Sequence, residues 1–540
     1  MAKKEGKLLQ HLGIVAGVCK EIGIAEKIDE LVDRPKRKVS VGKATEAMIV
    51  NALGFTGRAL YLTPQFYKGR PTELLLGDEV KAEDLHDDCL GTALEALYEA
   101  GVTELFYQVA SQALARYGIE HRFVHLDSTT FSLHGSYDAE EGEEEQPKLI
   151  SITKGFSKDN APELNQVVLS MMTTYGSSIP VWLEALSGNA NDKVTFRKSI
   201  REYRRQFKTK ELPYFVADSA LYTKESLKEL EGVKWVTRVP ETIGEAKNHI
   251  LSLDREQMDD CGNGYWIENV ESSYGEVAQR WLLVYSEKAF QRENATLEKK
   301  IENATEEKEK QLWHLGNKPF ACEADAEEAA KAFEKKLRYH SLTYRIERKF
   351  HYGKKGRPTA ADEPVGESWY IRGELEKNLE AIERARAFKG VFIIATNETD
   401  AKKLPSEQLL EVYKAQGTSV ERGFRFLKDP MFYAESLYLK SPKRIMALLM
   451  VMGLSLLVYS LAERKLRSAL QAHGQKIKDQ KGKPYDRPTI RWVFQIFENV
   501  LLFSFHSEAG TENMVMNMED DHHTVIKCLG PPFEKIYFLE

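Results

Sequence analysis

The 540-residue sequence has few cysteines and lacks the short motifs of several enzyme classes. The cysteines are odd in number, widely separated and never arranged as Cys-x-x-Cys; they are Cys19, Cys89, Cys261, Cys322 and Cys528. This pattern argues against a disulfide framework and against a structural zinc site. The sequence also contains no P-loop, Gly-x-Ser-x-Gly, His-Glu-x-x-His or dinucleotide-binding motif. A reducing cytoplasm fits this composition.

The first residues do not predict secretion, and the chain contains one long hydrophobic run. The first residues, MAKKEGKLLQHLG, are basic but include no apolar core or small-residue cleavage site, so we do not expect secretion. Residues 445–462, IMALLMVMGLSLLVYSLA, have about the minimum apolar length for a membrane span. A helix that is apolar on every face can equally be the central helix of a large protein. We favour this second interpretation and expect a cytoplasmic protein with no membrane partner.

The chain carries a small net negative charge overall, but positive charge is concentrated locally. The formal net charge is −6, which argues against a simple nucleic-acid coat, because phosphate binding needs clustered cations. However, residues 421–491 contain 15 Lys and Arg against 6 Asp and Glu, and RPKRK at 34–38 forms a second basic cluster. Acidic residues concentrate elsewhere, notably in DAEEGEEE at 138–145. The basic C-terminal third therefore permits a polyanionic partner.

The hydrophobic periodicity changes along the chain. Residues 1–115 show apolar residues at three- and four-residue spacing, which predicts a separate helical domain. From residue 119 three β-rich runs, HRFVHLDSTTFSLHG, NQVVLSMMTTY and IPVWLEALSG, predict consecutive antiparallel strands. A helix over about 192–207, a strand in PYFVADSALYT, a helix near 224–230 and a strand at 233–239 follow. This order predicts a mixed α/β sheet.

Residues 240–388 interrupt this pattern and are interpreted as an insertion, partly helical and partly β. Within them QRENATLEKKIENATEEKEKQLWHL predicts a charged helical arm or short coiled coil. The core resumes with an apolar strand in VFIIATNETD, so that 119–239 and 389–470 together form the core. Helices are expected to dominate to the end, with 471–540 as a helical C-terminal region.

Two acidic residues share a matched local context. Asp127 in VHLDSTT and Asp218 in FVADSALY each follow an apolar run and precede serine. Adjacent core strands can bring such acids side by side, and two neighbouring carboxylates repel each other unless a cation neutralises them. Hard oxygen ligands of this kind suit Mg²⁺ or Mn²⁺. For either residue alone, a capped turn or helix start is the alternative interpretation.

A third acid is suggested by SVERGFRFLKDP at 419–430. In a helix that starts near Thr418, the side chains of Glu421, Arg425 and Lys428 share one face. An acid beside two cations could meet a metal ion and a phosphate backbone together. The alternative is an ordinary amphipathic helix.

This set of segments resembles the DDE transposases of bacterial insertion sequences, in particular the cut-and-paste superfamily whose third acid lies in a Tyr-Arg-Glu-Lys signature. The resemblance covers most of the chain. It rests on the helical N-terminal region and on segments in the family's order: HLDSTTF, GFSKDNAPELNQVVLS, IPVWLEALSGNANDKVTF, FVADSALYT, FIIATNETD and VERGFRFLKDPMF. The resemblance implies an RNase H-like catalytic core with a large insertion after its fifth strand.

The resemblance also implies roles for single residues. Asp127, Asp218 and Glu421 correspond to the three catalytic, metal-binding acids, and Lys428 follows Glu421 after the required six residues. The signature departs from the family at its start, because its Arg falls at Gly417 and its Tyr at Lys414, with Tyr413 one residue early. For the DNA contact, Arg422 and Arg425 stand as substitutes for the absent Arg, beside Lys428.

The implied function is a DNA transposase that cleaves element ends and joins them to target DNA, using two Mg²⁺ or Mn²⁺ ions. The implied partners are the terminal inverted repeats and target DNA, bound by a homodimer in a synaptic complex. The helical residues 1–115 could bind the element ends, or form a scaffold or dimerisation surface. A metal-dependent nuclease without strand joining and a domesticated DNA-binding protein remain the alternative functions.

Overall fold

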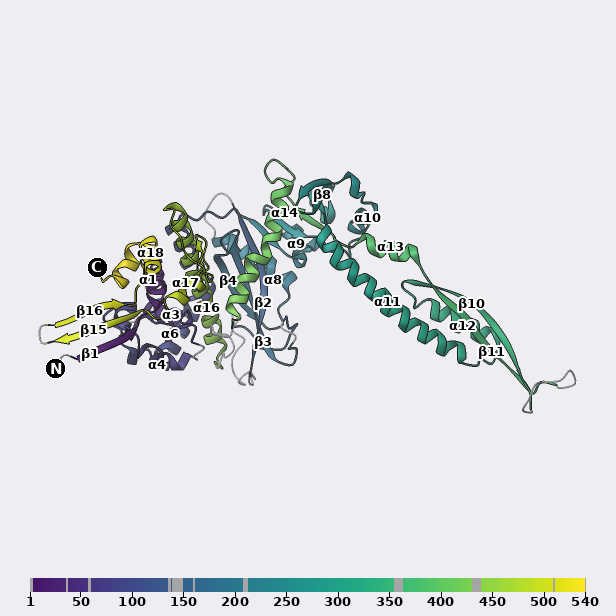
Figure 1. The fold of residues 1–540 in the computed structure, drawn as a ribbon, viewed down its shortest axis with the longest axis horizontal. Helices are drawn as coiled ribbons and strands as arrows, with labels where there is room; N and C mark the ends of the chain where they lie inside the picture. The colour runs from purple at the N-terminus through teal and green to yellow at the C-terminus, as the bar shows by residue number, and fades with distance from the viewer. Residues whose placement is uncertain are drawn as a thin grey trace. The chain divides into compact units, whose positions relative to one another are not determined.

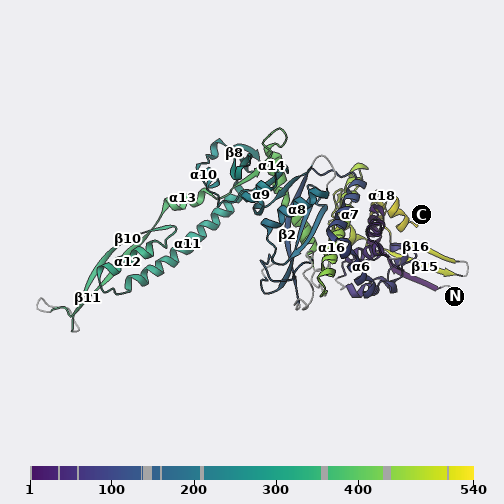
Figure 2. The same cartoon turned by 180° about the vertical axis from the view of Figure 1, so that it is seen from behind.

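The computed structural model describes residues 3–34, 37–56, 60–134, 137, 149–158, 161–206, 212–353, 363–429, 439–507 and 510–539. The acidic run at 138–145 and part of the RPKRK cluster lie outside these residues. The chain divides into two compact units (Figures 1 and 2). The first unit comprises 1–237, 273–277 and 396–540, and the second comprises 238–272 and 278–395.

The first unit begins with a short strand and a block of helices. The elements are β1 (Lys3–Leu8), α1 (Leu12–Ile22), α2 (Ile24–Leu31), α3 (Val41–Ala52), η1 (Leu60–Leu62), α4 (Thr63–Tyr67), α5 (Thr72–Leu76), η2 (Ala82–Asp84), α6 (Asp87–Ala100) and α7 (Val102–Arg116). Local signals set several boundaries: Gly23, at φ +67°, separates α1 from α2, and the Ser40 hydroxyl caps α3 by accepting from the N–H of Lys43.

The helix α16 (Pro442–Ala472) forms the centre of this block. It packs against α1, α3, α6 and α7 and against strand β4 of the sheet. By length and hydropathy it passes the test for a membrane span, but 94% of its most apolar window is buried inside the protein. The interpretation of 445–462 as a buried central helix agrees with this packing, since neighbouring helices cover every face of the run.

The catalytic-core sheet follows the helical block in the sequence. Its elements are β2 (Phe123–Leu133), β3 (Asn165–Thr174), β4 (Pro180–Ser187), α8 (Asp192–Gln206), β5 (Tyr214–Ala217), η3 (Ser219–Leu221), α9 (Lys224–Glu229) and β6 (Trp235–Arg238). The strand order within the unit is β4-β3-β2-β5-β6. The pairs β2–β3 and β3–β4 are antiparallel, whereas β2–β5 and β5–β6 are parallel. This order and direction define an RNase H-like core, as predicted.

The C-terminal part of the first unit contains helices and some unexpected strands. The elements are α14 (Ser406–Lys414), η6 (Ala415–Thr418), α15 (Val420–Leu427), α16, β13 (Ile477–Lys478), β14 (Pro484–Tyr485), α17 (Ile490–Ile496), β15 (Leu501–Ser507), β16 (Gly510–Met516), α18 (Asp520–Leu529) and α19 (Pro531–Tyr537). The strands β13 to β16 lie in a region for which the sequence analysis predicts helices. β15 pairs with β1 at the N-terminus, a contact of too long a range for local patterns to reveal.

The two ends of the chain also meet through helices α1 and α19. Gly17 of α1 lies directly under the ring of Phe533, since a Cβ at residue 17 would stand 2.6 Å from its Cδ1. Gly13 has the same relation to Tyr537 and Ile536. The N-terminal helices therefore share one hydrophobic core with the C-terminal segment.

The second unit contains further sheet strands and a long helical and β-hairpin segment. The sheet elements are β7 (Asp259–Gly262), β8 (Tyr265–Ser272), β9 (Gln279–Ser286) and β12 (Val391–Thr396), with α10 (Gly244–Ser252), η4 (Arg255–Gln257) and α13 (Leu379–Ala387). The remaining elements are α11 (Glu287–Asn317), α12 (Glu323–Glu334) and the hairpin β10 (His340–His351) and β11 (Gly366–Lys377), whose strands pair in antiparallel register. The charged run at 291–315 is thus a single helix, α11, which packs against β11.

Candidate active site

Asp127 and Asp218 come from neighbouring strands of the core sheet. Asp127 lies in the middle of β2, and Asp218 directly follows β5. The parallel register pairs His125 with Val216. Because parallel strands advance together, two further residues bring Asp127 level with Asp218. Asp218 stands at a strand end, as expected, but Asp127 does not, since β2 continues to Leu133.

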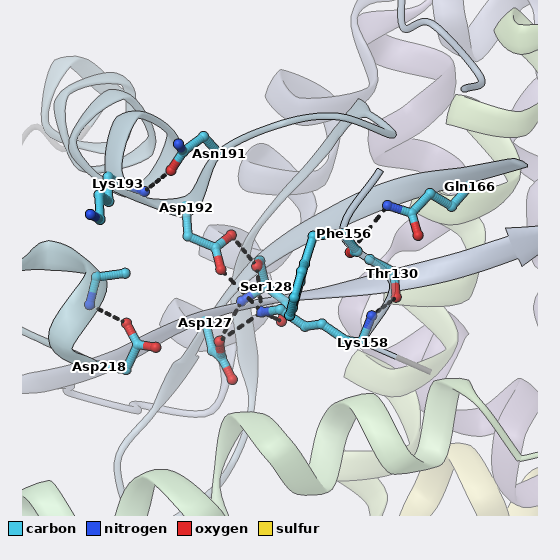
Figure 3. A network of polar contacts seen from close by, with 11 residues as sticks. Asp127, Ser128, Thr130, Phe156, Lys158, Gln166, Asn191, Asp192, Lys193 and Asp218 are labelled. Atoms are coloured by element: carbon cyan, nitrogen blue, oxygen red, sulfur yellow. Dashed lines mark hydrogen bonds and ion pairs between the residues drawn. The ribbon is translucent and has the colours of Figure 1, made fainter. Parts of the chain in front are cut away.

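Each carboxylate uses one oxygen for a hydrogen bond to the backbone that follows it. Oδ1 of Asp127 accepts from the N–H of Ser128 at 2.7 Å, and Oδ1 of Asp218 accepts from the N–H of Ala220 at 2.9 Å, which caps η3. Across the described ranges, Oδ2 of either acid accepts no hydrogen bond (Figure 3). The local bonds hold both side chains in place and leave one oxygen of each for a ligand.

A lysine and a third carboxylate adjoin Asp127 (Figure 3). Nζ of Lys158 lies 3.8 Å from Oδ1 of Asp127 and 3.2 Å from Oδ2 of Asp192, the first residue of α8. The same ammonium donates to the carbonyl oxygen of Ser128 at 2.7 Å and to its hydroxyl at 2.9 Å. The Ser128 hydroxyl donates to Oδ1 of Asp192 at 2.5 Å.

Burial and the clustered charges shift the pKa values of Asp127 and Asp218 upward. Burial raises the pKa of Asp127 to about 6; the Lys158 ammonium opposes this, and the negative charges of Asp218 and Asp192 add to it. Burial also raises the pKa of Asp218, and the charge of Asp192 adds to that shift. Burial and the neighbouring negative charges therefore disfavour the ionised form of both carboxyl groups in the metal-free protein. Both would be favoured as carboxylates by an added cation.

The helix α15 covers the sheet face that carries Asp127. The hydroxyls of Ser419, just before α15, and Thr173 on β3 are 2.7 Å apart. Gly423 brings the helix against β3, because a Cβ there would lie 2.8 Å from Cε of Met171. Met171 pairs with Asp127 across the antiparallel register, so both side chains project from the same face.

Glu421 lies in the first turn of α15, and the structure does not bring its carboxylate into the acid pair. The face formed by Val420, Phe424 and Leu427 is buried as expected, whereas Glu421 is exposed. Its carboxylate lies beside Gly417, where a Cβ would be 3.5 Å from Oε2. In the part of the chain that the structure describes, no group of three or more His, Cys, Asp or Glu side chains is close enough to hold one metal ion.

Arg422 has a structural partner. Its guanidinium donates to Oε1 of Glu463 on α16 at 2.8 Å. Glu463 is 6% exposed and also binds Arg467 at 2.8 Å and accepts from the backbone N–H of Ile490 at 3.0 Å. This buried carboxylate therefore ties together α15, α16 and the start of α17.

The other two cations of α15 are placed differently. Arg425 is exposed, and its Nη2 lies 3.4 Å from the carbonyl oxygen of Gly417, the position where the signature has arginine. Nζ of Lys428 lies 5.7 Å from the centre of the Phe131 ring on β2. Of the two substitutes for the absent arginine, Arg425 is thus the one beside that position.

Asp192 and Lys158 are site residues that the sequence patterns do not predict. Both occur in segments quoted for the family resemblance, GFSKDNAPELNQVVLS and IPVWLEALSGNANDKVTF. Asp192 is also the first residue of α8, where acids commonly stabilise a helix N-terminus, so local sequence gave it an ordinary explanation.

The chemistry of the donor set fits a hard divalent cation. Two carboxylates at one level of the sheet, each with an oxygen that accepts no hydrogen bond from the described residues, match the preference of Mg²⁺ for one or two protein carboxylates completed by water and substrate phosphate. An RNase H-like strand order, β4-β3-β2-β5-β6, with one acid on β2 and one directly after β5, defines a metal-dependent enzyme of phosphodiester cleavage and transfer.

The comparison with known proteins specifies the class further. The family described as "Transposase DDE domain" matches residues 118–459, more than half of the chain, and the chain therefore belongs to this family of DDE transposases. Family membership implies that the enzyme acts on DNA and depends on a divalent metal ion. Residues 4–111 match a domain of unknown function, DUF4277.

Other comparisons add little. No curated protein matches the chain at a significant level. Among solved structures, a piggyBac transposase synaptic complex with hairpin DNA matches over 92% of this chain and 82% of that one, with a TM-score of 0.38 and 8% sequence identity. This similarity is too low to support any conclusion about the present chain.

Proposed function

We propose that the protein is the transposase of a bacterial insertion sequence and that Asp127, Asp218 and Glu421 are its catalytic, metal-binding acids. The observation that carries the assignment is the acid pair at one level of β2 and β5, in which Oδ2 of each acid has no hydrogen-bond partner among the described residues. The placement of α15 over the same sheet face supports Glu421 as the third acid, with a shift of its exposed carboxylate needed to complete the group.

The reaction consists of two in-line displacements at phosphorus. In the first, water attacks the phosphodiester at the element end, the bond from phosphorus to the 3′ oxygen breaks, and that oxygen leaves as a 3′ hydroxyl after protonation. In the second, this hydroxyl loses its proton and attacks a target phosphodiester, which forms a new P–O bond and releases the target's 3′ oxygen. Two Mg²⁺ or Mn²⁺ ions, when bound, would supply charge neutralisation and lower the pKa of the nucleophile.

The residues of the chain contribute placement and charge to these steps. The carboxylates Asp127 and Asp218 would hold the cations, and their hydrogen bonds to Ser128 and Ala220 orient them. Arg425 and Lys428, on the same flank of α15 as Glu421, would contact the DNA backbone. Arg422 would act mainly through its ion pair with Glu463, rather than by touching DNA.

The biological setting is also a proposal. Joining two element ends to one target requires two active sites in one complex, and we propose a homodimer that binds the terminal inverted repeats. The five cysteines are all free, which is compatible with action in the cytoplasm on nucleoid DNA. Residues 1–115 would contribute to binding the element ends. Because these helices share a core with α16, substitution of the exposed Arg37 tests this role better than truncation does.

The test uses Asp127→Asn, Asp218→Asn and Glu421→Gln in the full chain, with DNA that carries the inverted repeats flanking the coding region. Each variant should lose strand cleavage and joining in Mg²⁺ by at least about a thousandfold while it binds the end DNA as wild type does. Retained cleavage in all three variants would overturn the assignment. Cleavage without any joined product in the wild type would point to a nuclease instead.

A further inference from the structure

Four oxygen atoms surround the Lys158 ammonium. Oxygen atoms are also the preferred ligands of a hard divalent cation. The partners of Lys158 are the Ser128 carbonyl at 2.7 Å, the Ser128 hydroxyl at 2.9 Å, Asp192 at 3.2 Å and Asp127 at 3.8 Å. Its side chain is only 32% exposed, and those of Asp127 and Asp192 are 18% and 26% exposed. Lys158 is accessible to solvent, but unlike Lys154 its ammonium has these four oxygen contacts, which hold the charge at the site.

We propose that Lys158 is an internal counter-ion that competes with the divalent metal ion for Asp127. In the metal-free protein the ammonium neutralises Asp127, whose repulsion with Asp218 and Asp192 would otherwise be uncompensated. When the metal ion binds, the ammonium loses its contact with Asp127 and keeps its contacts with Asp192 and Ser128. This inference rests on the proposed function, because it takes Asp127 to be a metal ligand.

The distances make this exchange easy. The contact with Asp127 is the longest of the four, so its loss leaves the three shorter contacts of Lys158 in place. The Ser128 hydroxyl donates a hydrogen bond to Oδ1 of Asp192, and Oδ2 of Asp192 lies 3.2 Å from the ammonium. Asp192 is therefore a positioning residue that retains Lys158 when Asp127 changes its partner.

The positive charge of Lys158 is expected to lower the affinity of the site for a divalent ion substantially. A divalent ion on Asp127 would lie on the order of 5 Å from the ammonium, where the repulsion, even in a water-like medium, corresponds to at least about a tenfold loss of metal affinity. In a partly buried site the penalty is larger. A neutral side chain at position 158 should remove this penalty.

The test measures Mn²⁺ binding to the full-length, EDTA-treated protein at pH 8 by electron paramagnetic resonance, with calorimetry as a second method. Lys158→Met should bind Mn²⁺ at least about tenfold more tightly than wild type. Lys158→Arg, which keeps the charge, and Lys154→Met, which removes an exposed lysine of the same segment, should stay within about threefold of wild type. Lys158→Gln serves as a second neutral variant if Lys158→Met fails to fold.

The role of Asp192 is tested by a double-mutant cycle. Asp192→Asn should weaken Mn²⁺ binding in the wild-type background. Without the charge of Asp192, the Lys158 ammonium interacts more strongly with Asp127 and competes more strongly with the metal ion. In the Lys158→Met background the same change should have a clearly smaller effect. Equal effects in the two backgrounds would show that Asp192 does not act through the lysine.

Two failures can be told apart. If wild type and Asp127→Asn bind Mn²⁺ equally, the metal-ligand role of Asp127 is wrong, and the proposed function loses its basis. If Asp127→Asn weakens binding but Lys158→Met binds no more tightly than wild type, only the competition is wrong.

Discussion

Replacement of Asp127 by asparagine should stabilise the metal-free protein at neutral and alkaline pH. Folding buries this carboxylate and raises its pKa from 3.8 to about 6. A group whose pKa is raised by folding stabilises the fold fully below its unfolded pKa and loses that contribution as the pH rises through its folded pKa. Wild type therefore loses stability between about pH 4 and pH 7, whereas the asparagine variant does not titrate at this position.

The size of the effect follows from the shift. A raised pKa of about two units corresponds to a maximum of about 3 kcal/mol in favour of asparagine at pH 8. At pH 5 the advantage should be about 1.6 kcal/mol, at pH 4 about 0.5 kcal/mol, and near pH 3 it should approach zero. Asparagine preserves an acceptor for the Ser128 N–H, and Lys158 keeps Asp192, so these contacts largely survive the substitution.

The assay is thermal unfolding of wild type and Asp127→Asn from pH 5 to pH 8 in EDTA, with exposed Asp33→Asn as the matched control. The melting temperature of Asp127→Asn should exceed that of wild type, and the difference should increase with pH. The control should have the same melting temperature as wild type at each pH. In Mg²⁺ wild type should gain about 2.7 kcal/mol at a concentration of 100 times the dissociation constant, and the variant much less. A variant that melts lower than wild type at pH 8 in EDTA, or a lead without pH dependence, would refute the reasoning.

Four further substitutions test packing and charge in the first unit. Glu463→Gln should lower stability by about 3 kcal/mol in thermal unfolding, because it weakens the buried partner of Arg422; an unchanged melting temperature would contradict the structural role of this acid. Gly17→Val should cost about 1–3 kcal/mol through its clash with Phe533, and Phe533→Ala should cost less in the valine background than in wild type; additive losses would show that the two residues do not meet. Arg425→Ala, at an exposed position, should leave the melting temperature within about 1 °C of wild type but reduce end cleavage at moderate salt at least about tenfold; unchanged cleavage would remove this residue from the DNA contact.

Much of the fold could be predicted because the relevant signals are local. The β-branched residues of the three runs from residue 121 predicted β2, β3 and β4, and the three- and four-residue spacing predicted the helices within residues 1–115. Helix α11 showed as a charged periodic run, and α16 as a run apolar on all faces. These signals reflect which faces of an element are covered, and the sequence records that directly.

Strands β1, β13, β14, β15 and β16 were missed for the opposite reason. β13 and β14 have only two residues each, and β16 is exposed along most of its length, so local patterns mark them weakly. The pairing of Lys3 with His506, at opposite ends of the chain, depends on where the intervening core brings both segments.

The site shows the same division. By itself the sequence determined that Asp127 and Asp218 follow apolar strand residues, and that Glu421, Arg425 and Lys428 share a flank of one helix, because these are matters of composition and spacing. Only the tertiary structure decided that the two aspartates stand level on parallel strands and that Lys158 and Asp192 join Asp127. It also left the Glu421 carboxylate outside the pair. Register between strands and contacts across many tens of residues arise from packing of the whole core, and no local pattern specifies them.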